Sequence, residues 1–361
     1  MSTNVVAILG TYPSGPMNQP TQVASLFEFR QRFGTSPASG VPESATLYYA
    51  VSQFFENSGQ ACHVVRVADN SAASFAGSRA GKTGLYALDR LKAFNLLAMP
   101  GASDKNVLTL AEAYCVERGA FLIVDAPAEA VTPAQISSVV TGGLLPRSSQ
   151  AALYYPWISI ADELNGNKPI LVPPSGSVAG IYASTDATKG VWKAPAGVDA
   201  RLNGVLSLAR GLTDSEAANL SSLNVNCLRT FAGIGAVVWG ARTLQAAGQS
   251  PSAYLYVPIR RFVMNIEQSI QQGTSWAVFE PNGPALWGQV RQSVSGFLTQ
   301  LFQQGALQGT TPAKAFFVRC DATTMTQSDI NQGNLIIEVG VAVLKPAEYV
   351  ILRFGLKAGK P

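Results

Sequence analysis

The sequence predicts an α/β fold (mixed α+β) in which a mixed sheet carries helices on its faces. β-rich runs alternate with amphipathic helical patterns over the first two thirds of the chain, and this alternation is typical of layered α/β proteins. Of the 361 residues, 47% are hydrophobic and 13% are charged. This composition leaves few charges for a water-facing surface, so we expect neighbouring subunits to cover part of it.

The first two thirds of the chain hold several well-delimited elements. An apolar helical face that ends before Gly59 predicts a helix at this point. A second helix is expected from Asp104 to Arg118, with Asp104 as its N-cap and Gly119 as its C-cap. Short β-rich runs predict strands at residues 62–67, 120–125 and 151–155.

The last third predicts two amphipathic helices followed by strands. Apolar residues at helical spacing extend over residues 259–270 and again over residues 286–302. Pro284 suits a first helical turn, and Gly273 and Gly305 suit left-handed C-terminal caps. Strands are predicted at residues 315–320, 335–344 and 349–356.

Several long segments of this chain together indicate one protein family. The C-terminal region supplies IEQSIQQGTSWAVFEPN, ALWGQVRQSVSGFLTQLFQQGALQG, AFFVRCD and KPAEYVILRF. Earlier segments are AILGTYPSGPMNQP, LYALDRLKAFNLLAMPGA, VPPSGSVAGIYASTDATKGVWKAPAG and FAGIGAVVWGARTL. These segments resemble the contractile tail sheath proteins of phages, tailocins and contractile injection systems. They keep the order of the family and span most of the chain, so the resemblance is far more specific than a short motif.

The resemblance implies a discontinuous tail-sheath core built from residues 1–70 and 201–361, with residues 85–200 as an α/β subdomain. Family members usually carry an outward-facing domain inserted after the strand that corresponds to residues 62–67. Here a short, loop-rich stretch takes that place, so we expect a minimal form that lacks the large outer inserted domain. The family's P-G-V-Y-x-E-E motif and extended arm do not precede Val5, so an N-terminal exchange arm is expected to be missing or short.

The resemblance also implies a function. A sheath protein is a structural subunit, not an enzyme, and it needs no cofactor. It polymerises helically, in stacked six-fold rings, around an inner tail tube protein, and it contracts to drive the tube through a target envelope. Further implied partners are baseplate and tail terminator proteins. The implied location is the tail of a virion or phage-like particle assembled in the cytoplasm of a bacterial host.

The resemblance points to a terminal strand that is exchanged between subunits. Sheath subunits add terminal strands to the sheet of a neighbour, which links them through main-chain hydrogen bonds. The corresponding residues here are Glu348, Tyr349, Val350, Ile351, Leu352, Arg353, Phe354, Gly355 and Leu356. Three arginines in blocks that resemble the family core, Arg242, Arg260 and Arg261, either bind between subunits or form pairs within the subunit.

Two other functions stay open at this point. AGSRAGKT, residues 76–83, satisfies a relaxed phosphate-loop pattern in which Lys82 would bind phosphates and Thr83 would bind magnesium. Against a P-loop-like nucleotide-binding protein, the preceding strand ends well before this segment, and Gly84 follows where a helix should begin. The second alternative is a non-sheath structural component of a tail or baseplate with the same core.

The residue content argues against several other functions. His63 is the only histidine, so neither a histidine metal site nor a catalytic triad has its usual members. Four scattered cysteines, Cys62, Cys115, Cys227 and Cys320, are expected to be buried apolar residues. The net charge of +4 is too small to indicate binding to nucleic acid. No apolar run is long enough to predict direct membrane insertion or a signal peptide.

Trp276, Phe279 and Trp287 are predicted to lie in the core, with a role as interface anchors as the alternative.

Overall fold

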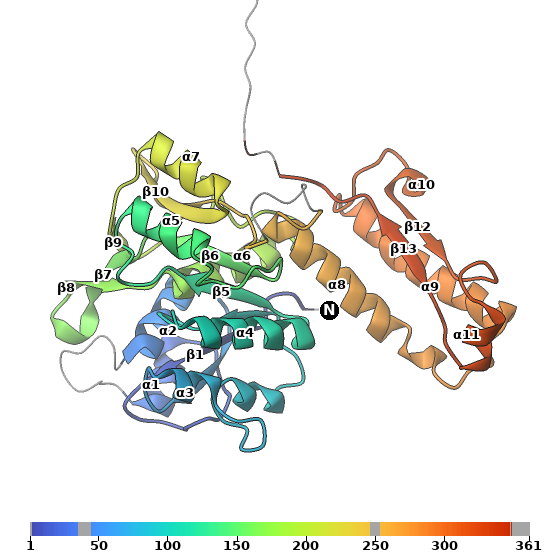
Figure 1. The fold of residues 1–361 in the computed structure, drawn as a ribbon, viewed down its shortest axis with the longest axis horizontal. Helices are drawn as coiled ribbons and strands as arrows, with labels where there is room; N and C mark the ends of the chain where they lie inside the picture. Colours follow the sequence, from blue (N-terminus) through green and yellow to red (C-terminus); the bar gives the residue numbers. More distant parts are fainter. Residues whose placement is uncertain (1, 35–44, 246–252, 347, 349–361) are drawn as a thin grey trace, which may run out of the picture.

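An α/β body and a helical arm make up the fold (Figure 1). The structure is a computed structural model, and it describes residues 2–34, 45–245, 253–346 and 348. We use "body" for residues 2–245 and "arm" for residues 257–344. The helix α8 (Val257–Gly273) begins at the body and runs out into the arm.

The body is organised around an eight-stranded mixed sheet with the strand order β11-β10-β6-β5-β4-β1-β3-β2. The six inner strands pair in parallel, and the two edge strands, β2 and β11, pair antiparallel. The bounds are β1 Val6–Thr11, β2 Thr21–Val23, β3 Cys62–Val67, β4 Leu96–Ala98, β5 Phe121–Asp125, β6 Ala151–Tyr155, β10 Val225–Phe231 and β11 Gly235–Trp239. The predicted mixed α/β class is therefore confirmed.

Helices cover both faces of this sheet, which explains why its inner strands are apolar without interruption. Successive residues of β1 face opposite cores: Val6 and Ile8 face one, whereas Ala7 and Leu9 face the other. The first core is closed by α1 Leu26–Phe33, α2 Thr46–Glu56 and α6 Ser175–Lys189. The second is closed by α3 Ala72–Ala76, η2 Gly84–Arg90, α4 Lys105–Arg118, α5 Pro133–Thr141 and α7 Asp214–Ser222.

Two glycines let α6 pack directly on the backbone of α2. A Cβ added to Gly176 would lie 2.4 Å from the carbonyl oxygen of Ala50, and one added to Gly180 would lie 2.5 Å from that of Phe54. Any larger residue at either position would push the two helices apart. The small residues of the segment SGSVAG are therefore required by this close contact.

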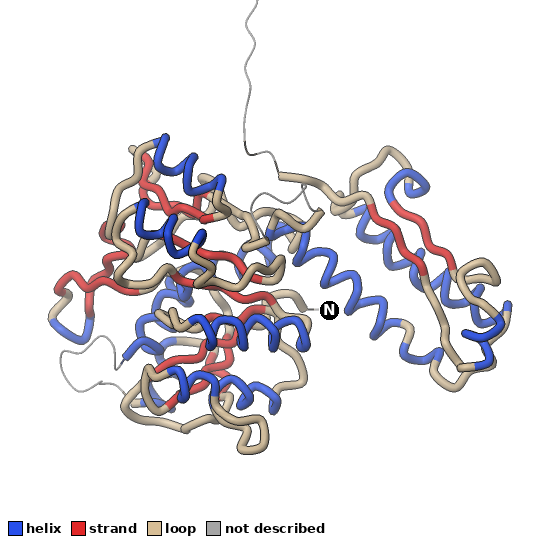
Figure 2. The backbone as a smooth tube through the Cα atoms, in the orientation of Figure 1, coloured by secondary structure: helices blue, strands red, loops and turns tan. Residues whose placement is uncertain are grey.

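Smaller sheets complete the body and the arm (Figure 2). In the body, β7 Ile158–Asp162 pairs with β8 Lys168–Val172 and with β9 Val205–Leu208, and η3 Glu163–Asn165 joins the first two. In the arm, η4 Ser275–Ala277 links α8 to α9 Pro284–Gln303. A two-stranded sheet follows, with α10 Pro312–Ala315, β12 Phe316–Arg319, α11 Gln327–Asn331 and β13 Glu338–Val341.

Local capping signals predicted several boundaries correctly. Asp104 caps α4 by accepting the N–H groups of Asn106 and Val107, and Gly119 ends the helix in the left-handed conformation. Gly305 is also left-handed, and the N–H groups of Gly305 and Ala306 bond back to the last turn of α9. The prediction for Gly273 was wrong, because this glycine is the last helical residue of α8 and Thr274 is the C-cap.

The strand predictions for the arm are confirmed with shorter bounds, as β12 and β13. The strand predicted at residues 349–356 lies outside the described residues. Strands from residues 1–70, 85–200 and 201–361 all join the one large sheet. The predicted division of the chain into those three parts stays a prediction.

A buried carboxylate fixes the start of α6. Asp125, at the end of β5, accepts hydrogen bonds from the Ser175 N–H (2.8 Å), the Ser175 hydroxyl (2.6 Å) and the Gly101 N–H (3.1 Å). The N-cap residue Pro174 provides no side-chain bond, so Asp125 takes the role of a cap from another element. Burial raises the pKa of Asp125 to about 6, although the three donors oppose this shift.

Replacing Asp125 by asparagine should change how stability depends on pH. Because the folded pKa lies above the unfolded value, the carboxyl stabilises the fold most below pH 4, and this contribution is lost as the pH rises through 6. Between pH 4 and pH 7, the free energy of unfolding measured with urea should fall on the order of 3 kcal/mol more in the parent chain than in Asp125→Asn. Parallel pH profiles for the two proteins would contradict this assignment.

Candidate functional site

The described residues offer no metal-binding cluster. They contain no group of three or more His, Cys, Asp or Glu side chains that could hold a metal ion. All four cysteines are free and buried, and burial raises the pKa of each thiol, which keeps it protonated and unreactive. Burial also lowers the pKa of His63. Within the described ranges, no helix is long and apolar enough to cross a membrane.

The segment 76–83 does not have the geometry of a phosphate loop. The helix α3 separates it from β3, and the 3₁₀ helix η2 follows it in place of an α-helix. Several N–H groups in and next to it are already used: Ser78 donates to the Thr83 hydroxyl, Thr83 to the Ser78 carbonyl and Gly84 to the side chain of Asn18. These N–H groups are therefore not available to bind phosphate.

The edges of the β12–β13 sheet are the feature of the arm best suited to bind another chain. Each strand has four residues, and within the described part of the chain no further strand pairs with either edge. Ala342 donates to Ala315 and accepts from Gln308, both at 2.8 Å. In an antiparallel pair the neighbouring residues face the other way, so Val339 and Val341 direct main-chain groups to the outer edge.

The faces of this small sheet are uneven. One face packs against the arm core through the half-buried residues Phe316, Val318, Val339 and Val341. On the other face the Phe317 ring lies over Gly340, where an added Cβ would be 2.1 Å from the ring. A two-stranded sheet is marginal by itself. This sheet therefore has both a supporting helical layer and the capacity for further strands.

The last described residue, Glu348, lies back at the body. Its carboxylate accepts two bonds from Arg242, at 2.8 Å from Nε and 2.6 Å from Nη2, and one from the Tyr256 hydroxyl at 3.2 Å. Arg242 is itself fixed, because Nη1 donates to the Ser221 carbonyl and its backbone bonds to the Asn226 side chain. This cluster sets the point from which the terminal segment continues.

A buried ion pair joins α8 to the body. Arg261 donates to both carboxylate oxygens of Asp186 on α6, at 2.9 and 2.6 Å, and also to the carbonyl of Thr3 (3.0 Å). The side chains of Arg261 and Asp186 are only 4% and 1% exposed. The guanidinium also lies over the ring of Tyr182, 4.8 Å from its centre. The segment before β1, α6 and α8 are thus held together at one point.

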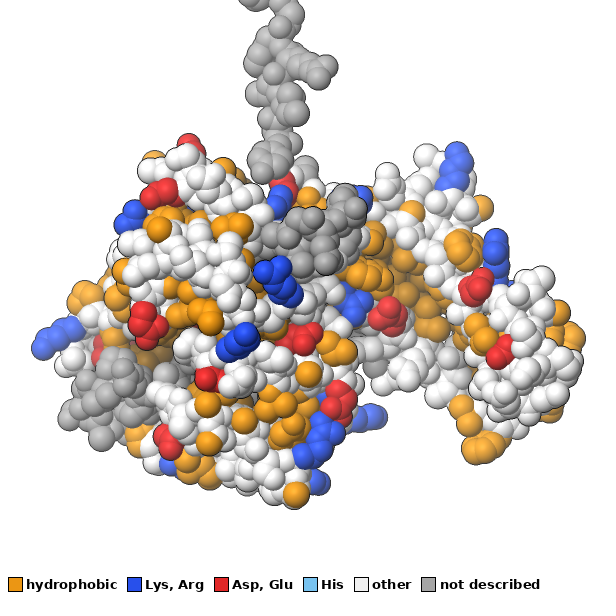
Figure 3. Space-filling model, in the orientation of Figure 1, with side chains coloured by type: hydrophobic (Ala, Val, Ile, Leu, Met, Phe, Trp, Pro, Cys, Tyr) orange, Lys and Arg blue, Asp and Glu red, His pale blue; other side chains and the backbone are white. Residues whose placement is uncertain are grey.

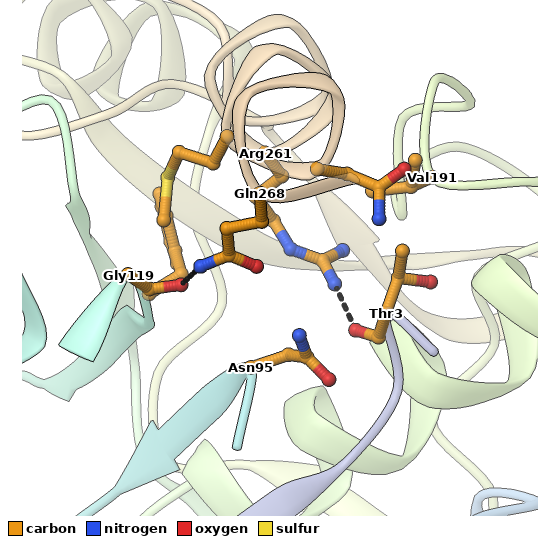
Figure 4. Close-up of a pocket in the computed structure, with 9 residues that line it drawn as sticks. Thr3, Asn95, Gly119, Val191, Arg261 and Gln268 are labelled. Carbon is orange, nitrogen blue, oxygen red and sulfur yellow. Dashed lines mark hydrogen bonds between the residues drawn. The ribbon is translucent and has the colours of Figure 1, made fainter. Parts of the chain in front are cut away.

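A small polar cavity lies beside this ion pair (Figure 4). Arg261 and Gln268 reach into it from α8, and Thr3, Asn95 and Gly119 border it from the body. Gln268 donates to the Gly119 carbonyl at 2.6 Å, whereas the Asn265 amide nitrogen is buried there without a partner. The contact between arm and body therefore combines these polar bonds with apolar packing, since Val191 and Trp192 of the body pack against Phe262 in the core of the arm.

All three arginines singled out in the sequence lie near this junction of arm and body. Arg260 donates to the Gln150 side chain at 2.6 Å and stacks over Tyr254. Each of the three therefore has partners within its own chain. Their role at a subunit interface stays a prediction. Sequence reasoning missed Asp186, Thr3 and Tyr182, because nothing local marks them as partners of Arg261.

The core prediction for the three aromatic residues is right only for Trp287, which is 8% exposed. Trp276 and Phe279 are exposed, because they lie in the turn between α8 and α9, where the helical spacing no longer applies.

Comparison with known proteins identifies the family of this chain. The model of the phage tail sheath protein central domain matches residues 76–244, and that of the phage tail sheath C-terminal domain matches residues 249–357. The chain belongs to the phage tail sheath family. The family resemblance noted in the sequence is confirmed, and it extends over both the body and the arm.

Solved structures of this family match nearly the whole chain. A chain in the cryo-EM structure of the anti-feeding prophage baseplate is 31% identical, with a TM-score of 0.82 over 99% of this chain and 94% of that one. A chain in the sheath complex of PVC, an extracellular contractile injection system in its contracted state, is 29% identical, with a TM-score of 0.81 over 98% and 92%.

Curated relatives are longer. The tail sheath protein of Burkholderia phage BcepMu is 26% identical over 88% of this chain and 65% of its own length. For the tail sheath protein of Vibrio phage KVP40, 27% identical, the match covers 51% of this chain and 26% of the relative. This sheath chain thus spans between about a quarter and two thirds of the length of these relatives.

Breaking the buried ion pair should destabilise the protein far more than breaking an exposed one. Asp186→Ala leaves the Arg261 charge buried without its partner, and such losses are about 3 to 5 kcal/mol. Asp199→Ala is the matched control, because its 2.6 Å pair with Lys189 is 67% and 45% exposed and should contribute less than about 1 kcal/mol. Urea unfolding of both variants measures the difference, and equal losses would contradict the role of the pair.

Proposed function

We propose that this chain is a structural subunit of a contractile tail sheath, which polymerises helically around an inner tube and contracts to drive that tube through a target envelope. The observation that carries the proposal is the match to sheath structures over 98% of the chain, including one in a contracted helical sheath at 31% identity. The partners we propose are further copies of the chain in stacked six-fold rings, the inner tube protein, and baseplate and tail terminator proteins. The proposed location is the tail of a virion or phage-like particle assembled in the bacterial cytoplasm.

We infer that residues 348–356 of one subunit add to the β12–β13 sheet of another. The edges of that sheet support this, since no described strand pairs with them and Val339 and Val341 direct main-chain groups outward. The position of Glu348 at Arg242 also supports it, because the terminal segment then starts from a fixed point on the body. The outward N–H and C=O groups of Val339 and Val341 would make about four main-chain hydrogen bonds, each worth roughly 0.5 to 1.5 kcal/mol, and would join neighbours by several kcal/mol.

Such a joint suits contraction. Main-chain pairing along one strand keeps two subunits linked while the bodies rotate, and the weaker contacts between bodies rearrange. Head-to-tail contacts that do not close produce an open helix. The extended sheath then stores the free energy during assembly as a metastable state, and contraction needs no nucleotide.

The second candidate function is a structural component of the baseplate. It has support from the match to a chain of the anti-feeding prophage baseplate, with a TM-score of 0.82. Electron microscopy of the purified protein separates the two, because a sheath subunit forms long tubes and a baseplate component forms small closed rings.

Deleting residues 349–361 should leave a folded subunit that cannot form long tubes. The deletion keeps Glu348 on Arg242, so circular dichroism and the melting temperature should stay close to those of the parent chain. Electron microscopy should show no tubes, since the inferred links between subunits are gone. Truncation after Leu356 is the matched control, and it should form tubes. Tubes of normal length from the larger deletion would remove strand donation from the account.

Replacing Lys82 by alanine should leave assembly and contraction intact. The N–H groups around Lys82 bond within the loop, so the segment has no phosphate to bind in this proposal. Tube formation by electron microscopy and binding of a fluorescent ATP analogue measure the two functions separately. Stoichiometric binding of the analogue by the parent chain and its loss in Lys82→Ala would favour a nucleotide-binding protein.

A further inference from the structure

The turn between α8 and α9 exposes three large apolar side chains at the end of the arm. Trp276 is 43% exposed, Val278 is 63% exposed and Phe279 is completely exposed, at 102%. We call these three residues the knuckle. Hydrophobic side chains are visible at the lower end of the arm in Figure 3. A cluster of this kind on an otherwise polar turn indicates a surface that a partner covers.

The backbone supports a role in binding. Phe279 has a φ of +73°, a left-handed conformation that is strained for a bulky residue and that glycine or asparagine would adopt more readily. Stability of the isolated subunit therefore does not explain a phenylalanine at this position. A residue that is both strained and fully exposed is better explained by a contact made outside its own subunit.

Neighbouring contacts hold the knuckle in place beside the small sheet. The Asn282 side chain donates to the Asn334 carbonyl at 3.0 Å, and it accepts the indole N–H of Trp287 at 2.8 Å. Asn334 lies just before β13. The knuckle is therefore next to the N-terminal end of β13. Ile336, which is also exposed, lies between Asn334 and β13 in the sequence.

The sheet edge is shorter than the terminal segment, and this difference determines what can reach the knuckle. An edge of four residues is about 13 Å long, whereas residues 348–356 extend over about 30 Å at 3.3 Å per residue. More than half of a donated strand must therefore extend past the sheet. At the far end of β13, the Leu307–Val343 bridge already extends the pair toward the body. The knuckle lies at the opposite end.

The chemistry of the terminal segment matches the knuckle. The segment carries Tyr349, Ile351, Phe354 and Leu356, which need an apolar surface where the sheet no longer supports them. It also carries Arg353 and Lys357, and the knuckle is followed directly by the exposed Glu280. Opposite charges next to an apolar contact favour one orientation of the bound strand.

We propose that the knuckle is the docking surface for the part of a neighbouring copy's terminal strand that extends past β13. The inference rests on the proposed strand donation and adds a second, side-chain contact to it. Main-chain hydrogen bonds at the sheet edge do not depend on the sequence of the bound strand. The knuckle would bind the apolar side chains of the terminal strand and so fix its register.

Photo-crosslinking in assembled sheath identifies the occupant directly. Phe279→p-benzoylphenylalanine, in a mixture of isotopically heavy and light full-length chains, should crosslink to residues 349–361 of a different copy. Phe27, which is 70% exposed on α1 of the body, is the matched control with the same substitution and should give no such crosslink. Crosslinks from Phe279 to the inner tube, to a baseplate protein or to another part of a second copy would overturn the proposal.

A second variant separates docking from folding. Phe279→Asn relieves the positive φ, so the melting temperature of the subunit should stay the same or rise. The concentration needed for tube formation should nevertheless increase at least about tenfold, the factor that corresponds to 1.4 kcal/mol. An unchanged concentration would overturn the proposal and leave the proposed function intact. Failure of the unaltered chain to form tubes would instead remove the proposed function, and the knuckle proposal with it.

Discussion

The edges of the arm's two-stranded sheet are the constraint on which the rest of the structure depends, because no further strand in the described ranges pairs with them. A pair of four-residue strands has little stability of its own, and its outer N–H and C=O groups must bond to water or to another chain. The arm core supports one face of the pair, and no other strand among the described residues pairs with its edges. These are the edges to which we propose that a neighbouring copy adds its terminal strand.

The body provides the fixed frame that such an arm requires. Its eight-stranded sheet lies between two apolar cores, and Arg261 joins α8 to Asp186 on α6 and to Thr3 before β1. Because the pair is buried and bidentate, it specifies one orientation of α8 on the body. The Arg242–Glu348 contact then places the start of the terminal segment on the same body. Helix α8 and Glu348 are therefore both positioned by the body.

Local signals predicted the elements well, because they depend on a few neighbouring residues. The helix α4 has its N-cap at Asp104 and its left-handed end at Gly119, and α9 begins at Pro284 and ends before Gly305 as expected. The predicted family followed from long segments in a fixed order, and the two domain models confirm it.

Long-range contacts could not be predicted in the same way. Asp186 precedes Arg261 by 75 residues, and its helix has no local feature that marks a buried charge pair. Trp276 and Phe279 were placed in the core because apolar residues are usually buried. That rule does not distinguish burial within a subunit from burial by a partner, and both side chains are exposed within their own subunit.

The most direct test of this account is a cryo-EM reconstruction of assembled tubes at a resolution that traces residues 349–361. We expect the terminal segment of each subunit to leave its body at Glu348, to pair with the β12–β13 sheet of a neighbouring copy and to pass over that copy's Phe279. A segment that folds back onto its own subunit, with both sheet edges still open in the tube, would contradict the central claim.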